Sequence, residues 1–187
     1  MADYKISDAD FKKLDALKNP KVWKVIREAA ELMKPDTVMV FDDSSADIEK
    51  VRILAIKYGE EAKLASEGHT IHYDGYWDQA RDKANTATLL PQDQKLSRGL
   101  NVKERVSGLE EIFNIMDGAM NGKVMIVRFF CLGPTKSRFS IRALQITDSF
   151  YVAHSEDLLY RTGYDEFMNM PDKDDFFYFW HRLLSVC

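Results

Sequence analysis

The chain has 187 residues, of which 45% are hydrophobic and 30% are charged, and its formal net charge is -4. This length and composition are typical of one globular domain with a buried core. The acidic balance argues against a nucleic-acid-binding protein, which would usually present a basic face. No stretch approaches the ~20 apolar residues of a membrane span. The charged N-terminal stretch also lacks the apolar core of a signal peptide.

The cysteine content points to a reducing compartment. Only Cys131 and Cys187 occur, and they lie far apart in the sequence. Two distant cysteines do not suggest a disulfide scaffold, so the cytoplasm is the expected location. Neither nucleic acid nor a membrane is an expected partner. Cys131 receives no functional role, since most buried cysteines are inert.

The first third of the chain predicts two helices, a strand and a third helix. Ser7 can cap a helix that ends near Asn19, and Pro20 suits the first turn of the next helix. Pro35-Asp36 ends that helix before a buried strand at Thr37–Asp43, and a helix at Ala46–Tyr58 follows. The apolar positions expected to face the core are Phe11, Leu14 and Leu17, then Val22, Val25, Ile26, Ala29, Ala30 and Met33, then Ile48, Val51, Ile53, Leu54 and Ile56.

The rest of the chain continues the alternation of helix and strand. Short strands are predicted at Thr70–Tyr73 and Thr86–Leu90, and a polar loop then runs to Val102. A helix at Lys103–Met120 should turn Val106, Leu109, Ile112, Phe113 and Met116 inward. Strands at Val124–Val127 and Ala143–Ile146 enclose a loop at Gly133-Pro134, and Thr147-Asp148-Ser149 begins a last helix. The predicted fold class is α/β: a single domain with a mixed β-sheet flanked by helices.

Two features resemble ligand sites but favour structural interpretations. Gly118–Lys123 resembles a phosphate loop, yet it has three residues between its glycines instead of four, and Val124 stands where a hydroxyl is needed. It also runs from helix to strand, so we interpret it as a helix C-terminus and turn. His69 and His72 would point to opposite sides of a strand, and their spacing implies no further ligand, which disfavours a metal site.

The two acids after the Thr37 strand allow two interpretations. Asp42 and Asp43 could lie beside a ligand crevice, because acids at the carboxyl end of a strand often do. Asp43 with Ser44 and Ser45 also forms an ordinary N-cap cluster, and capping is favoured.

The region from Phe129 to Arg161 carries a distinctive order of small and polar residues. Its markers are Cys131, Leu132-Gly133-Pro134, Ser137, Ser140, Thr147-Asp148-Ser149, Tyr151-Val152 and Ala153-His154-Ser155. This series resembles the N-terminal part of GTP-dependent phosphoenolpyruvate carboxykinase, and the archaeal members most of all. That family has a Met/Leu-Gly-Pro loop, a strand that ends in Thr-Asp-Ser and a helix that begins with Tyr-Val. A series with fixed gaps is more specific than one short motif.

Two upstream segments agree with the resemblance. Thr37–Asp43 and the following serines match a family strand that ends in Asp-Gly, with Asp43 in place of the glycine. Tyr73–Arg81 resembles a family segment in which an arginine holds the acidic substrate, and Arg81 falls on that arginine. A guanidinium can grip a carboxylate or phosphate at two points and stays charged, which suits phosphoenolpyruvate and oxaloacetate. Lys83 stands where the animal enzymes commonly have glutamate, so a role for that acid does not carry over.

The resemblance implies a reaction but also limits what this chain contributes to it. The family converts oxaloacetate and GTP to phosphoenolpyruvate, GDP and carbon dioxide. Its phosphate loop, metal ligands and guanine-stacking aromatics belong to a later part of a longer protein, and those motifs are not found in this sequence. Residues 1–187 are therefore expected to be the N-terminal, substrate-side domain, without the C-terminal nucleotide- and metal-binding domain and inactive alone. GTP and Mn²⁺ or Mg²⁺ are expected only with that C-terminal part.

The aromatic run Phe176–Trp180 bears on partners. It either packs on the domain's own sheet or partly faces the absent lobe, in which case the chain could self-associate through it. Three readings of the whole chain stay open: a carboxykinase N-terminal domain, a stand-alone relative that binds or senses carboxylate or phosphate metabolites, and an unrelated α/β interaction domain.

Overall fold

A computed structural model of the chain describes residues 4–73, 86–97 and 99–182. The elements in chain order are β1 (Lys5–Ile6), α1 (Asp8–Ala16), α2 (Pro20–Met33), β2 (Thr37–Val40), α3 (Ser45–Lys57), β3 (Ala62–Lys63), β4 (Thr70–Ile71), β5 (Thr88–Leu90), β6 (Val102–Glu104), α4 (Arg105–Met116), β7 (Val124–Leu132), β8 (Ile141–Thr147), α5 (Phe150–Leu159), β9 (Arg161–Thr162), α6 (Tyr164–Asn169) and β10 (Phe177–His181).

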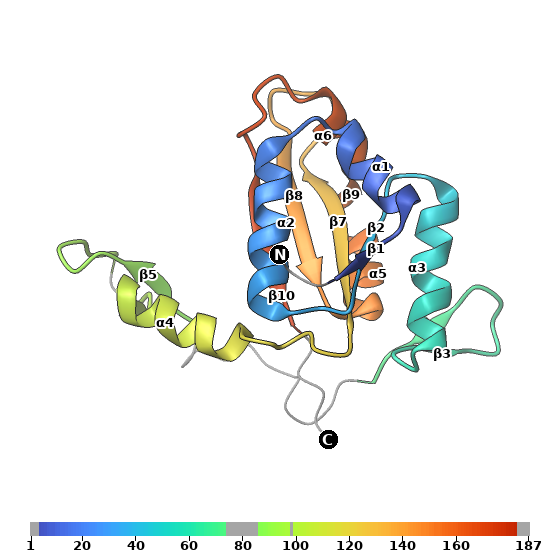
Figure 1. Cartoon of the computed structure of the whole chain (residues 1–187), viewed down its shortest axis with the longest axis horizontal. Coiled ribbons are helices and arrows are strands. Elements are labelled where there is room, and N and C mark those ends of the chain that lie inside the picture. The colour runs from blue at the N-terminus through green and yellow to red at the C-terminus, as the bar shows by residue number, and fades with distance from the viewer. Residues whose placement is uncertain (1–3, 74–85, 98, 183–187) are drawn as a thin grey trace.

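A six-stranded mixed sheet forms the centre of the structure (Figure 1). Its order is β1-β2-β7-β8-β10, and β9 pairs with the far end of β7. The neighbours β1/β2, β2/β7 and β8/β10 are parallel, whereas β7 and β8 form an antiparallel hairpin. The predicted fold class, an α/β domain with a mixed sheet flanked by helices, is confirmed.

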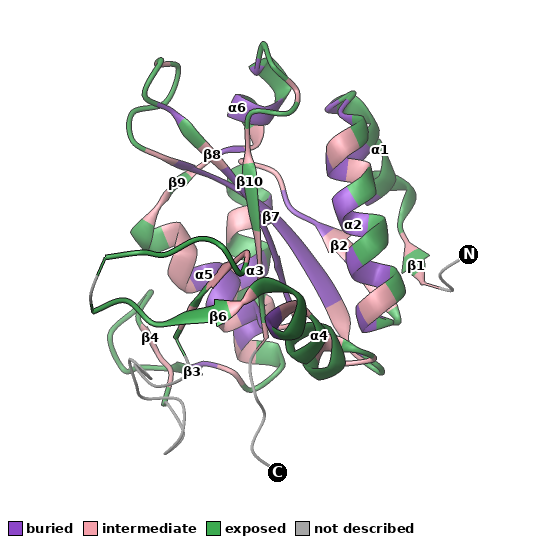
Figure 2. Ribbon diagram, turned by 90° about the vertical axis from the view of Figure 1, so that its left-hand side faces the viewer, coloured by how far each residue is buried: buried purple, intermediate pink, exposed green. Residues whose placement is uncertain are grey.

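One layer of helices covers each face of the sheet, and the central strand β7 is therefore buried on both faces. On β7, Met125, Val127 and Phe129 join the apolar cluster under α1, α2 and α6, while Ile126 joins the cluster under α3 and α5. Figure 2 shows β7 buried along nearly its whole length. We call the six-stranded sheet with α1, α2, α3, α5 and α6 the layered body.

The hairpin between β7 and β8 depends on one glycine. Gly133 has a φ of +77°, a region that L side chains rarely adopt. A Cβ at this position would also lie 2.6 Å from the backbone oxygen of Phe139. Glycine is therefore needed to start this turn, and Leu132-Gly133-Pro134 is one of the markers of the family pattern.

The prediction for the Lys103–Met120 helix is wrong in two respects. The helix, α4, is shorter, and Lys103 belongs to β6. Val106, Ile112 and Phe113, which were expected to face inward, are exposed, and Gly108 is the buried residue of α4. The reason is that α4 packs on the small parallel pair β5/β6, where Gly108 admits the Leu89 side chain, and not on the main sheet.

Together β5, β6 and α4 project away from the sheet in Figure 1, and we call these three elements the arm (described residues 88–97 and 99–116). Met116, at the end of α4, is only partly buried against the main apolar cluster. Most of the apolar surface of the arm is therefore left without cover from the layered body.

Candidate functional site

The predicted substrate contact, Arg81, lies in residues 74–85, outside the described residues. The described residue His72, which precedes this segment, is held by contacts with two other segments of the chain. The His72 ring stacks on Tyr151, with ring centroids 3.5 Å apart and 11° between the planes. The Nδ1 atom of His72 also lies 2.6 Å from the backbone oxygen of Glu60. The described flank of the Arg81 segment, which ends at Tyr73, thus lies beside the N-terminus of α5.

The triplet Thr147-Asp148-Ser149 begins α5 as predicted. Ser149 is the N-cap, and its hydroxyl accepts a hydrogen bond from the Val152 N–H. Glu60 completes the cap from another element: its Oε2 accepts from the Ser149 hydroxyl at 2.5 Å and from the Tyr151 N–H at 2.8 Å. A carboxylate at a helix N-terminus is favoured by the helix dipole. We call this region, where β8 ends, the Thr147–Ser149 end of the sheet.

A cavity of about 290 Å³ opens at the Thr147–Ser149 end. Its lining residues are Tyr58, Glu60, Gly122, Lys123, Val124, Asp148 and Phe150. The parallel strands β8 and β10 both finish at this end, and ligands of open α/β sheets bind outside the carboxyl ends of strands. Lys123 forms an ion pair with the buried Asp148 carboxylate at 2.5 Å, so its charge is already neutralised. An acidic ligand at this cavity would therefore need a further cation.

His181, the last residue of β10, lies at the same end of the sheet. Burial lowers the pKa of His181, and the charge of Asp148 opposes the change only in part. The ring is therefore neutral near pH 7, since even an unperturbed histidine has a pKa of about 6.5. A neutral ring can donate or accept a hydrogen bond but supplies no charge for an anion.

The Gly133-Pro134 loop lies at the other end of β8. Seven residues of strand separate the two ends, which corresponds to about 20 Å. The hydroxyls of this loop hold its own shape: Ser140 donates to the backbone oxygen of Pro134 at 2.8 Å and accepts from the Ser137 N–H at 3.1 Å. The two parts of the family pattern therefore do not form one site among the described residues.

The capping interpretation of Asp43 agrees with the structure, but the helix is a different one. Ser44 caps α3, whereas Asp43 accepts hydrogen bonds from the N–H groups of Tyr164 and Asp165 at the start of α6. Burial raises the pKa of the Asp43 carboxyl, and these two hydrogen bonds offset part of the increase. No signal in the sequence pairs residue 43 with residues 164 and 165, because the contact is made only by the fold.

The Gly118–Lys123 turn has no free backbone N–H group that could bind a phosphate. Each of its six backbone N–H groups donates within the protein, three of them to the Leu32 and Met33 carbonyls and to the Asp36 carboxylate. The turn runs from α4 into β7, as predicted. It is a helix C-terminus and connection, with no phosphate-binding geometry.

The histidines have protein partners. His69 Nδ1 lies 3.1 Å from the Glu67 oxygen, and His154 Nδ1 lies 2.7 Å from the Glu61 carboxylate. Within residues 4–73, 86–97 and 99–182, no group of three or more His, Cys, Asp or Glu side chains is arranged to hold a metal ion. The described residues therefore do not fit a metal cofactor.

Sequence reasoning missed a buried ion pair in the layered body. Arg128, on β7, is almost fully buried, contacts the Asp157 carboxylate and lies 5.9 and 5.4 Å from the ring centres of Phe41 and Phe130. Burial lowers the pKa of Arg128 and raises the pKa of Asp157, while their mutual attraction opposes both changes. The signal was a single cation within an otherwise apolar strand, Val124–Leu132.

These features define the class of protein: a three-layer α/β domain with a central mixed sheet and a helix that starts at Thr147-Asp148-Ser149. Residues 24–184 match the family model described as phosphoenolpyruvate carboxykinase N-terminal domain. The match covers most of the chain, which therefore belongs to that family.

Curated relatives agree with this assignment. The chain is 50% identical over 171 residues to phosphoenolpyruvate carboxykinase [GTP] of Thermococcus kodakarensis, covering 91% of this chain and 27% of the relative. The corresponding enzyme of Pyrococcus abyssi is 48% identical over 176 residues, covering 94% of this chain and 28% of the relative. That of Saccharolobus solfataricus is 39% identical over 158 residues, or 84% and 26%. The chain thus spans about a quarter of the length of the curated relatives it matches.

Among the helices in the described part of the chain, none is long and apolar enough to cross a membrane.

Proposed function

We propose that this chain is the N-terminal, substrate-side part of a GTP-dependent phosphoenolpyruvate carboxykinase. The observation that carries the proposal is the 50% identity to such an enzyme over 91% of the chain. The contacts of His72 with Tyr151 and Glu60 support it, because they start the Arg81 segment at the end of the sheet where β8 and β10 finish.

Arg81 has the chemistry that the substrate requires. Phosphoenolpyruvate and oxaloacetate carry two or three negative charges in a small volume. A planar guanidinium can donate two parallel hydrogen bonds to a carboxylate or phosphate and remains charged at any working pH. In the described part of the Thr147–Ser149 end, Lys123 is already paired with Asp148. We therefore assign the binding of the acid to Arg81.

The proposal places GTP and Mn²⁺ or Mg²⁺ on a different part of the enzyme. The turn at Gly118–Lys123 uses its donors internally, and the described residues hold no cluster of metal ligands. The full reaction, a decarboxylation and phosphoryl transfer that serves gluconeogenesis, then requires that part as well. We place the enzyme in the cytoplasm, which suits the unpaired thiol of the buried Cys131.

The arm is the surface that we propose meets the rest of the enzyme. Val106, Phe113 and Ile115 of α4 are 64%, 44% and 53% exposed. The strands β5 and β6 form an isolated parallel pair, whereas parallel sheets normally have both faces covered. A surface of this kind is completed by further strands or by another apolar surface. The portion of the carboxykinase relatives that this chain does not match is the proposed partner.

The aromatic strand β10 offers a second candidate contact. Phe176 and Trp180 pack against the main apolar cluster, whereas Phe177 and Tyr178 are 43% and 45% exposed at the edge of the sheet. Self-association of the chain through this strand is therefore a proposal that competes with docking through the arm. Sedimentation of the Phe177→Ser and Phe113→Ser variants separates the two, because each removes apolar surface from one site only.

Calorimetry with phosphoenolpyruvate tests the substrate role. A binding event that is present in the wild type and in Arg105→Ala, an exposed arginine of the arm, but lost in Arg81→Ala would support the proposal. Equal heats in all three proteins would exclude Arg81 as the anion contact. Heat without catalysis, even when the unmatched part of the Thermococcus kodakarensis enzyme is added, would favour a stand-alone binding or regulatory domain. Phosphoenolpyruvate formation from oxaloacetate and GTP in that mixture would support the enzyme assignment.

A further inference from the structure

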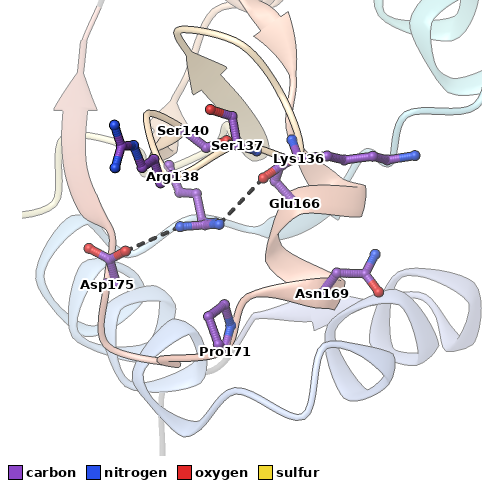
Figure 3. Close-up of a pocket in the computed structure, with 9 residues that line it drawn as sticks. Lys136, Ser137, Arg138, Ser140, Glu166, Asn169, Pro171 and Asp175 are labelled. Carbon is purple, nitrogen blue, oxygen red and sulfur yellow. Dashed lines mark hydrogen bonds and ion pairs between the residues drawn. The ribbon is translucent and has the colours of Figure 1, made fainter.

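A second, larger cavity lies at the Gly133–Pro134 end of the sheet, away from the Arg81 flank (Figure 3). Its volume is about 680 Å³, which is within the range of about 300–1,000 Å³ for small-molecule sites. Its lining residues are Lys136, Ser137, Arg138, Ser140, Arg142, Glu166, Asn169, Pro171 and Asp175. Three of these are cations and two are acids, so the lining carries a net positive charge.

Arg142 is the buried cation of this cavity. Its side chain is 11% exposed, and its two terminal nitrogens reach Asp175 at 3.2 Å and Glu166 at 3.4 Å. The Nε atom is buried and has no hydrogen-bond partner. Asp175 is a largely exposed carboxylate, so its long contact with Arg142 is a weak one that a stronger anion can replace.

Two further cations stand on a loop with a fixed shape. The turn is held by Gly133, by the Ser140 hydroxyl and by the Glu166 carboxylate, which accepts from the Lys136 N–H. Lys136 itself has a φ of +55°, so the loop is fixed in a conformation that few residues adopt. Among the described residues neither Lys136 nor Arg138 forms an ion pair, and Arg138 lies 4.8 Å from the ring centre of Phe139.

The arrangement of the cations indicates the size of the ligand. Lys136 and Arg138 extend in opposite directions in Figure 3. The third cation, Arg142, contacts Asp175 and Glu166. An anion with two or more separated charged groups can reach one loop cation and Arg142 at once.

We propose that this cavity is a second anion site, which binds a small polyanion, either a polyphosphate or a polycarboxylate. The anion takes the place of the Asp175 carboxylate on Arg142 and contacts Lys136 or Arg138. Asp175 lies two residues before β10, so the exchange also releases the segment that leads into this edge strand. The site uses none of the residues of the Thr147–Ser149 end and does not require Arg81.

Calorimetric titration of the whole chain with pyrophosphate and, separately, with citrate tests this site and distinguishes the two kinds of anion. We expect saturable 1:1 binding of at least one of them. The double variant Lys136→Gln/Arg138→Gln should bind about tenfold more weakly for each charge-assisted hydrogen bond that is lost. The matched control Lys12→Gln/Arg105→Gln, which removes the same two charges elsewhere, should bind as the wild type does.

Two more variants make the result decisive. Asp175→Asn removes the competing carboxylate and should tighten binding, an effect opposite to general damage to the fold. Arg81→Ala should leave binding unchanged. Absence of binding, equal weakening in the matched control, or weaker binding by Asp175→Asn would overturn the proposal. Loss of binding in Arg81→Ala would also overturn it, because the anion would then occupy the substrate site, and the proposed function would remain intact.

Discussion

The layered body and the arm carry similar sequence patterns but have different surroundings. In α2 of the body, all six apolar residues at helical spacing are buried against the sheet. In α4 of the arm, apolar residues recur at comparable spacing, yet Gly108 is the buried residue. The pattern indicates that a helix has an apolar side. It does not indicate whether the same chain supplies the surface that covers that side.

This difference suggests that the body stabilises the fold and that the arm mediates association. The body has two apolar clusters, one on each face of the sheet, and can hold its fold with its own residues. The arm has a two-stranded parallel sheet and an exposed apolar helix, which is marginal by itself. Changes in the body should therefore affect stability, and changes in the arm should affect association.

The largest effect is expected for Arg128→Met, which breaks the buried ion pair of the body. The substitution leaves the Asp157 carboxylate buried without its cation, and breaking such a pair costs about 3–5 kcal/mol of unfolding free energy. Urea denaturation measures the loss. The double variant Arg128→Met/Asp157→Leu should recover much of it, because no uncompensated charge then remains at position 157. A loss below about 1 kcal/mol in the single variant would show that the pair is not integral to the body.

A slightly smaller effect is expected for Leu144→Ala on the opposite face of the sheet. Leu144 is fully buried in the cluster under α2, and removing such a side chain costs about 2–5 kcal/mol. The matched control is Leu158→Ala, in an exposed position near the end of α5, where a change within about 0.5 kcal/mol is expected. Similar losses in both variants would contradict the burial pattern of the body.

The pH dependence of the body should reveal Tyr164. Burial, together with the nearby carboxylates of Asp42, Asp43 and Asp165, raises the pKa of Tyr164 from 10.0 to about 12. The folded state then keeps the hydroxyl proton between these two values, while the unfolded state releases it. This contribution to stability is complete below pH 10 and is lost as the pH rises toward 12. Denaturant unfolding at several alkaline pH values should show a shallower decline for Tyr164→Phe than for the wild type, and parallel declines would contradict the assignment.

The smallest effect on stability is expected in the arm. Phe113→Ser changes an exposed side chain, so the unfolding free energy should stay within about 0.5 kcal/mol of the wild type. The same variant should weaken association with the unmatched part of the Thermococcus kodakarensis enzyme, as followed by sedimentation. A large loss of stability without any change in association would show that the arm is packed within this chain, and the contrast with the body would fail.

Local features of the candidate site could be predicted, whereas its assembly could not. The start of α5 at Thr147-Asp148-Ser149 follows from hydroxyl and carboxylate oxygens that suit an N-cap, and Ser149 fills that role. Glu60, the second hydrogen-bonding residue of this cap, lies 89 residues away from Ser149. Nothing in the sequence near either residue predicts the contact. The same holds for Asp43, which caps α6 across 121 residues. The position of Arg81 itself stays a prediction.

The amino-acid sequence alone determined the helices α1, α2, α3 and α5, the central strands and the membership of the carboxykinase family. These properties depend on spacing, on capping residues and on the order of short motifs, which are all local. The tertiary structure decided which apolar faces are covered, that the Gly133-Pro134 loop lies about 20 Å from the Thr147–Ser149 end, and that Arg128 is buried with Asp157. Such properties arise from contacts between residues far apart in the chain, and periodicity within one segment carries no information about its distant partner.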